Sequence, residues 1–328
     1  MQSKIRKILL TGAAGFIGSR TAELLLKTGR QVLGVDSLND SCDLRLKKYR
    51  LHRLTSMSKE FRFYRSDIRD LQSLKNIFKE SNPQAVIHLA ARAGVRYSLE
   101  NPFIYAETNI LGVLNTLELC REFKVPKLIL ASTSSLYAAE KSPFREDSPA
   151  NTPISPYAAT KKAAETLCYT YHYLYGIDIT VLRYFTVYGP CGRPDMSYFK
   201  FIQQIEQGKP VMVYGDGRQK RDFTYVDDIA QGTVMALKKT GYRVINLGGG
   251  KRYELSHMIR LIEKNLGKKA SLRYLPENKT DMRDTWADNT LARRILGWRP
   301  KISLEEGIRR TVAWHRENKD WLKGVALK

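Results

Sequence analysis

The sequence predicts an α/β protein with a doubly wound parallel sheet at its centre and a smaller C-terminal α/β domain. Three observations support this fold class. Short apolar runs recur along the first half of the chain, segments with helical spacing separate them, and a glycine-rich turn follows the first run. Alternating strands and helices of this kind form right-handed crossovers, which bury a parallel sheet between two layers of helices.

The predicted elements follow one another in a regular order. Each expected strand is a short apolar run that stops at a glycine, an acid or a polar cluster, as buried parallel strands do. We expect strands over residues 7–11, 31–36, 61–65, 85–90, 127–132 and 178–184. Helical spacing over 16–26, and helical segments near 70–80, 103–123 and 157–175, complete the alternation.

The pattern loosens after Tyr184. Residues 187–195 and 214–221 are rich in glycine, proline and charge, and only short elements follow them. We therefore expect a dinucleotide-binding Rossmann domain over 1–184 and a substrate-binding domain over 185–328. Residues 225–250 should return to the first domain, because 244–247 reads as one more strand of the main sheet.

Composition excludes several classes of function. The net charge is +22, but the basic residues are scattered, with only short clusters at 45–48 and 218–221. We therefore do not expect a nucleic-acid partner. The four cysteines have no metal-site or CxxC spacing, so we expect reduced thiols, a cytoplasmic protein and no metal. No signal peptide is visible, and no apolar run reaches the length of a membrane helix.

The glycine-rich turn is the first candidate binding site. Gly12, Gly15 and Gly18 follow a predicted strand and open a predicted helix that begins with Phe16 and Ile17. In that context Gly12 permits a tight turn, Gly15 lets a pyrophosphate approach the backbone, and Gly18 allows close packing of helix and strand. The alternative is a glycine-rich turn without a ligand.

An acid at the end of the second predicted strand selects between dinucleotides. Asp36 can accept hydrogen bonds from an adenosine ribose and would repel a 2′-phosphate, so it favours NAD over NADP. Arg45, Lys47 and Lys48 lie close in sequence and would weaken that preference. Asp67, after the third strand, could bind the adenine amino group or simply cap a helix.

The candidate catalytic residues are Tyr157 and Lys161, one helical turn apart. A free phenol ionises near pKa ~10, and a neighbouring ammonium would lower that value and make the phenol a usable base. The pair alone is a weak signal. It gains weight because the fifth predicted strand ends in the hydroxyl run 132–135, at the sheet edge where ligands bind in this fold.

These motifs together resemble the extended short-chain dehydrogenase/reductase superfamily over nearly the whole chain. The resemblance rests on the 12–18 loop, residues 88–91, Asn109, the run containing Thr133, and Tyr157 with Lys161. Residues 93–102, 183–196 and 215–226 are further similar to UDP-glucuronate 4-epimerases. Two departures stand out, because Cys191 replaces a common aromatic residue and Ala138 replaces a common glycine.

The resemblance implies a role for each site residue. Thr133, Tyr157 and Lys161 would be catalytic. NAD would contact the glycine loop, Asp36, Asp67, Ile68, Leu89, Ala90, Ala91 and Asn109, together with Tyr157 and Lys161. Arg193 would bind the sugar carboxylate, Arg96 would help to orient the substrate, and the remaining substrate-binding residues would be Ser134, Ser135, Thr186, Arg221 and Arg283.

The family resemblance implies a reaction as well. UDP-glucuronate and UDP-galacturonate would interconvert by oxidation at sugar carbon 4, rotation of the keto sugar and return of the hydride. Ser134 and Ser135 stand where dehydratases carry Asp-Glu, so assisted proton transfer at carbon 5 or 6 lacks its acid. The alternatives are a UDP-glucose/UDP-galactose 4-epimerase, a decarboxylase, or an NAD-binding regulator. Relatives suggest a homodimer through a bundle that includes 103–123 and 157–175.

Overall fold

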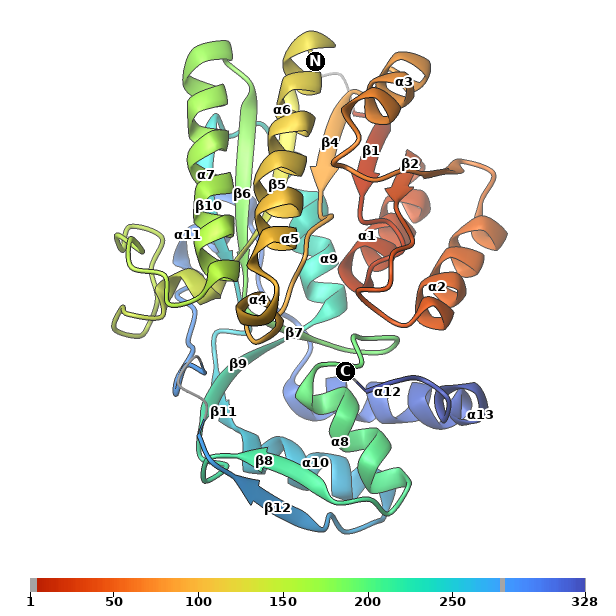
Figure 1. Cartoon of the computed structure of the whole chain (residues 1–328), viewed down its shortest axis with the longest axis vertical. Helices are drawn as coiled ribbons and strands as arrows, with labels where there is room; N and C mark the ends of the chain where they lie inside the picture. Colours follow the sequence, from red (N-terminus) through yellow and green to blue (C-terminus); the bar gives the residue numbers. More distant parts are fainter. Residues whose placement is uncertain (1–4, 278–280, 328) are drawn as a thin grey trace.

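A seven-stranded sheet forms the centre of the larger lobe in the computed structural model, which describes residues 5–277 and 281–327 (Figure 1). The strand order is β10-β6-β5-β4-β1-β2-β3, and every pairing is parallel. The strands are β1 Lys7–Thr11, β2 Gln31–Asp36, β3 Phe61–Arg65, β4 Ala85–His88, β5 Lys127–Thr133, β6 Asp178–Tyr184 and β10 Tyr242–Leu247. The predicted fold class is confirmed.

The order of the strands creates a crevice between β1 and β4. The chain runs outward from β1 to β3 and then returns to place β4 on the other side of β1. At such a reversal the two connecting segments diverge, so the carboxyl ends of the strands leave room for a ligand. In Figure 1 these ends face the smaller lobe.

Helices cover both faces of the sheet because successive strand residues point to opposite sides. Ile8 and Leu10 of β1 pack in the core beneath α1 (Phe16–Lys27), α9 (Val226–Met235) and α11 (Thr290–Leu296), whereas Leu9 packs in the core of the opposite face. That second face carries α3 (Leu71–Ser81), α6 (Gly112–Glu122) and α7 (Pro156–Tyr175). Most of the strand residues that face these two layers are therefore apolar.

Two helical regions differ from the expectation. The segment expected as one helix over 103–123 is α5 (Pro102–Ala106), a π-helical turn η1 (Glu107–Leu111) and α6, with the short α4 (Tyr97–Glu100) before it. Such π turns often occur at functional sites. The helix α2 (Leu44–Met57) was not expected, because basic residues obscure its apolar spacing; Asp43 caps it.

The smaller lobe has its own hydrophobic core. It contains the three-stranded sheet β11-β9-β7 (Arg252–Glu254, Lys220–Tyr225 and Thr186–Tyr188) and the pair β12-β8 (Leu272–Leu275 and Val211–Tyr214). Its helices are α8 (Ser197–Glu206), α10 (Leu255–Leu266), α12 (Leu304–Glu317) and α13 (Lys319–Leu322). The chain crosses back to the larger lobe through α9 and β10. Within the described residues, no helix combines the length and apolar character needed to cross a membrane.

Candidate active site

The glycine-rich loop lies between the carboxyl ends of β1 and β4. Gly12 has φ +72°, and a Cβ there would lie 2.8 Å from the backbone nitrogen of Ala90; a Cβ at Gly18 would lie 2.0 Å from the Gly12 oxygen. No side chain among the described residues caps α1, which begins at Phe16 and has no acid in its first turn. Its N-terminal amides and dipole therefore suit a phosphate group, and the loop fits a dinucleotide pyrophosphate.

Asp36 is buried beside this loop. Its carboxylate accepts hydrogen bonds from the amides of Ala14 at 3.1 Å and Leu38 at 2.9 Å. Lys47, on α2, lies 3.4 Å from the same carboxylate and also donates to Asn39. The role of Asp36 as a ribose ligand stays a prediction, and Lys47 compensates part of the negative charge of this carboxylate.

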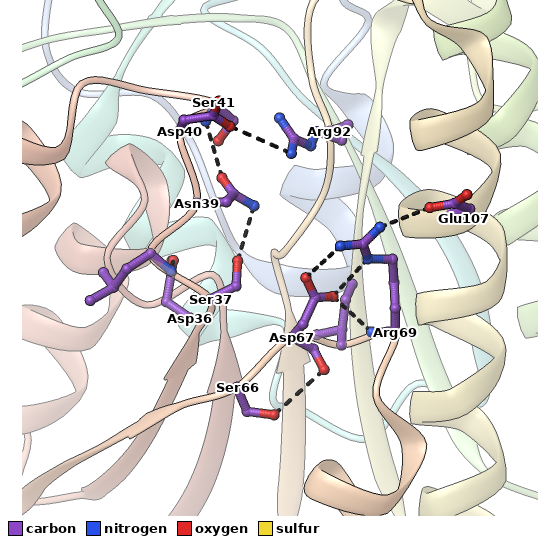
Figure 2. A network of polar contacts seen from close by, with 12 residues as sticks. Asp36, Ser37, Asn39, Asp40, Ser41, Ser66, Asp67, Arg69, Arg92 and Glu107 are labelled. Carbon is purple, nitrogen blue, oxygen red and sulfur yellow. Dashed lines mark hydrogen bonds and ion pairs between the residues drawn. The ribbon is translucent and has the colours of Figure 1, made fainter.

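Asp67 belongs to a second polar network at this edge of the sheet (Figure 2). It accepts hydrogen bonds from the backbone amide and the guanidinium of Arg69, which also pairs with Glu107 at 2.8 Å. Partial burial opposes ionisation of Asp67, but the bonds from Arg69 prevail and lower its pKa. Asp70, rather than Asp67, caps α3, so the helix-cap alternative does not apply.

The segment after β4 contributes backbone rather than side chains. The amide of Leu89 donates to the carbonyl of Thr11 at 3.2 Å, and the amide of Ala90 donates to the Thr11 hydroxyl at 3.2 Å. Ala91 follows them in the chain. Ile68, across the crevice, is buried against Gly112, where a Cβ would lie 2.5 Å from its side chain. These residues wall the crevice with small or apolar groups.

Asn109 joins that segment to the catalytic helix. It is fully buried in the π turn and exchanges two hydrogen bonds with the backbone of Arg92, at 2.9 and 3.0 Å. Its amide also donates to Thr160 on α7 at 3.1 Å. Asn109 therefore positions both the 88–92 segment and the helix that carries Tyr157.

Thr133 ends β5 and contacts Tyr157, and Lys161 lies one turn further along α7. Burial raises the pKa of Tyr157, while the Thr133 hydroxyl and the Arg193 guanidinium lower it. This net direction is opposite to our expectation of a phenol made more acidic by Lys161, because the loss of hydration outweighs the favourable contacts. Burial also lowers the pKa of Lys161 to about 8, which the charge of Glu165 partly opposes.

Glu165 is a site residue that the sequence analysis missed. It lies one turn beyond Lys161 on α7 and is buried. Arg183 of β6 binds its carboxylate with two nitrogens, at 3.0 and 2.7 Å, and Ser132 donates to it at 2.5 Å. The carboxylate thus ties the strand end that carries Thr133 to the helix that carries Tyr157. Its only signal in the sequence was its spacing from Lys161.

Arg193 brings a cation to the same place. Its guanidinium binds Asp195 at 3.0 and 2.5 Å, and its Nη2 would lie 3.7 Å from a Cβ at Gly94. Its charge acts on both Tyr157 and Tyr105, whose rings contact one another edge to face. Asp195, which the sequence analysis did not single out, holds this guanidinium beside the catalytic phenol.

The other expected substrate residues lie around this centre. Ser134 and Ser135 form the short 3-10 helix η2 (Ser134–Tyr137), and the Thr133 hydroxyl donates to Ser135 at 3.1 Å. Thr186 begins β7 and is partly buried. Arg96 pairs with Asp281 at 2.6 Å and lies over the Tyr214 ring at 4.0 Å. Burial lowers the pKa of Arg221, with Arg96 acting in the same direction and Asp281 and Asp284 against it.

Arg283 does not join this group in the structure. Its side chain is 82% exposed and pairs with Glu277 at 2.8 Å. The backbone around it is held, because its carbonyl accepts from Lys220. Its role as a phosphate ligand stays a prediction. His88, by contrast, lies in the core, where Thr116 contacts its Nδ1 and burial lowers its pKa to about 3, so it is a neutral packing residue.

Known proteins are similar to this chain over most of its length. The sequence model of the GDP-mannose 4,6 dehydratase family matches residues 9–311. A UDP-glucuronate 4-epimerase of Thermodesulfobacterium geofontis is 57% identical, over 97% of this chain and 99% of the relative.

Two solved structures give the same result in three dimensions. The UDP-glucuronic acid 4-epimerase of Bacillus cereus, solved with UDP-glucuronic acid and NAD, has a TM-score of 0.89 at 38% identity and covers 95% of this chain and 99% of its own. The UDP-glucose 4-epimerase of Thermotoga maritima, solved with UDP-glucose, has a TM-score of 0.86 at 33% identity and covers 95% and 99%. The chain therefore belongs to the extended short-chain dehydrogenases/reductases, in the family that the GDP-mannose 4,6 dehydratase model describes and that includes the UDP-glucuronate 4-epimerases.

Proposed function

We propose that this protein interconverts UDP-glucuronate and UDP-galacturonate with tightly held NAD. The observation that carries the proposal is the Arg193 guanidinium, held by Asp195 beside the phenol of Tyr157. A neutral hexose offers that cation only uncharged hydroxyl oxygens, whereas a sugar carboxylate would form a charge-assisted bond with it. The names of the relatives described above support the same substrate.

The residues of this chain would carry the proton and the geometry of the reaction. Thr133 and Tyr157 would bind the oxygen on carbon 4, and Tyr157 would take its proton in oxidation and return it in reduction. The chemistry that bound NAD supplies is reversible hydride acceptance. Lys161 would bind the nicotinamide ribose and stabilise the phenolate, with Glu165 keeping a negative charge one turn away. The keto sugar would turn between the two steps while Arg221 holds the phosphate oxygens, and Arg193 would bind the sugar carboxylate.

Epimerisation follows because no carboxylate directly follows Thr133 in the chain. Ser134 and Ser135 follow Thr133 in the structure, and neither can transfer a proton at carbon 5 or 6 as a carboxylate would. We further propose that Arg193 holds the carboxylate in an orientation that disfavours loss of carbon dioxide. Decarboxylation would otherwise follow oxidation to a β-keto acid.

One incubation tests this proposal. The protein is given UDP-glucuronate, and the sugar nucleotides and NADH are then quantified. We expect UDP-galacturonate, no net NADH and little or no UDP-pentose. Faster turnover of UDP-glucose, or stoichiometric NADH, would contradict it. Arg193→Ala tests the orienting role, because we expect a larger share of UDP-pentose from that variant than from the wild type.

We also propose a homodimer in the cytoplasm. Large apolar side chains are exposed on the adjoining helices α5, η1 and α7, among them Phe103 at 77%, Leu111 at 46% and Leu174 at 58%. Such exposure supports an interface there. All four cysteines are free thiols, which suits a reducing compartment. Light scattering after size-exclusion chromatography should give twice the chain mass; a monomeric mass would exclude the dimer.

A further inference from the structure

A buried arginine outside the catalytic group links the two halves of the site. Arg50 on α2 is 3% exposed. Its guanidinium donates to the carbonyl of Ala14 at 3.2 Å, to that of Cys191 at 3.1 and 2.7 Å, and to that of Gly192 at 2.9 Å. No carboxylate of the described residues lies within ion-pair distance of it. A buried cation is costly unless its donors are satisfied, and here three backbone carbonyls satisfy them.

The acceptors belong to two functional loops. Ala14 lies inside the glycine-rich loop that suits a pyrophosphate, and Cys191 and Gly192 directly precede Arg193. Arg50 therefore holds the loop of the sugar end against the loop of the cofactor end. Arg193, which directly follows this second loop's turn, is close enough for its charge to act on the phenol of Tyr157.

The turn before Arg193 has an unfavourable conformation that needs such support. Cys191 has φ +57°, a left-handed conformation that L-residues with a side chain rarely adopt. Gly192 allows no side chain, since a Cβ there would lie 1.8 Å from the Tyr198 hydroxyl oxygen. The carbonyls that this turn directs inward are those that Arg50 binds, so the guanidinium stabilises the strained backbone.

We propose that Arg50 is a positioning residue for recognition of the sugar carboxylate. By holding the carbonyls of Cys191 and Gly192 against the glycine-rich loop, it sets the position from which Arg193 reaches the substrate. This inference rests on the proposed function, because it assumes that Arg193 binds a carboxylate. Arg50 itself touches no substrate.

The test compares three variants of the full-length protein loaded with NAD. Arg50→Met removes every donor, and Arg50→Lys keeps the charge and one donor group. Arg53→Met is the matched control, because Arg53 lies one turn further along α2, is more exposed and pairs with Glu23. Calorimetry measures the affinity of each for UDP-glucuronate, UDP-glucose and UDP, and thermal unfolding establishes that each variant is folded.

We expect Arg50→Met to weaken the affinity for UDP-glucuronate by about tenfold. The affinities for UDP and UDP-glucose should change by less than about threefold, since a charge-assisted contact is lost only for the carboxylate. Arg50→Lys should lie between the wild type and Arg50→Met, and Arg53→Met should match the wild type. If Arg50 has only a structural role, Arg50→Met should reduce the affinity for all three ligands by the same factor, and that result would overturn the proposal.

An unchanged preference for UDP-glucuronate in folded Arg50→Met would also overturn it. If Arg50→Met does not fold, Arg50→Lys decides: a selective loss for UDP-glucuronate supports the proposal, and an unchanged or uniform effect refutes it. The wild type separates this inference from the proposed function. If the wild type itself does not prefer UDP-glucuronate to UDP-glucose, the proposed function fails whatever Arg50 does.

Discussion

Two buried lysines lie at opposite ends of the strand pair β5–β6, and their surroundings differ sharply. Lys127 begins β5, forms an ion pair with Asp178 across the register and donates to Thr180 at 2.7 Å. Asp178 in turn accepts hydrogen bonds from the backbone amides of Thr240 and Gly241, at 2.8 Å each. At this end the charges neutralise one another.

Lys161, near the carboxyl end of the same strands, is 2% exposed but has no direct carboxylate partner among the described residues. The nearest acid, Glu165, is occupied by Arg183 and Ser132. A direct ion pair would stabilise the ammonium more but would also occupy it. The amino end of the sheet therefore pairs its buried lysine with an acid, whereas Lys161 at the carboxyl end has no ion pair among the described residues, at some cost in stability.

The largest effect should come from removing the phenol at the carboxyl end. Tyr157→Phe deletes the general acid/base, so we expect kcat for UDP-glucuronate to fall by about 10²- to 10⁴-fold. Tyr171→Phe on the same helix is the control, because its hydroxyl binds Glu118 far from the site. A Tyr157→Phe variant with wild-type turnover would remove the catalytic role assigned to this end.

Replacing each lysine with methionine tests the comparison directly. Lys127→Met leaves Asp178 buried without its cation and should lower the free energy of unfolding by about 3 kcal/mol. Lys161→Met removes a poorly compensated charge, so stability at pH 7 should rise by about 2 kcal/mol while turnover falls by about 100-fold. Denaturant unfolding and steady-state kinetics measure both. If both variants lose the same stability, the two ends do not differ as described.

Glu165→Gln should alter the pH dependence of catalysis. The groups that act on Lys161 and Tyr157 are Glu165 and Cys168 on α7, His88 on β4, and Thr133 and Arg193. Loss of the Glu165 charge lowers the pKa of Lys161 further, so the alkaline limb of kcat should move down by about one pH unit.

Asp178→Asn is the control for that experiment. It breaks the buried Lys127–Asp178 pair and should reduce the free energy of unfolding. It should not change the pH profile of kcat, because Asp178 lies at the far end of β6. A profile of Glu165→Gln that coincides with the wild type would show that Glu165 acts only as structural support.

The smallest effect is a pH dependence of stability. Burial lowers the pKa of Lys161 to about 8 from its ordinary 10.5. Between these values the unfolded chain binds a proton that the folded protein does not, so the contribution of Lys161 to the free energy of unfolding rises with pH in that window. The wild type should therefore gain about 1 to 2 kcal/mol relative to Lys161→Met between pH 8 and 10. If the free energy of unfolding depends on pH in the same way for the wild type and Lys161→Met, the lowered pKa of Lys161 is excluded.

Local patterns were sufficient for much of the fold. The apolar runs at 61–65 and 178–184 are strands with those bounds, and Val244–Leu247 lies in the strand β10 beside β6. Such runs are visible because the strand residues that pack against the covering helices are mostly apolar. Helix α2 and the π turn at 107–111 were not visible, because their stability comes from contacts with other segments rather than from their own spacing.

Some residues of the candidate site could likewise be predicted from short sequence patterns, and others could not. Glycines 12, 15 and 18 and the pair Tyr157 and Lys161 carry short-range signals, since their spacing reflects a turn or a helix face. Arg50 carries no such signal, because it acts through carbonyls of other segments. Asp195 lies two residues from Arg193, and Glu165 lies one turn from Lys161, but neither spacing by itself indicates a role. The prediction that the pKa of Tyr157 is lowered was wrong for the same reason. The sequence does not show how much hydration the phenol loses on burial.

Periodicity and spacing within short segments were sufficient to predict the fold class, the glycine-rich loop and the candidate catalytic pair Tyr157 and Lys161. Only the tertiary structure decided which charges are compensated and which carbonyls Arg50 holds together. It also decided that Arg283 faces Glu277 and solvent. Charge compensation and hydration depend on distances between segments that are remote along the chain, and those distances exist only once the two lobes have packed.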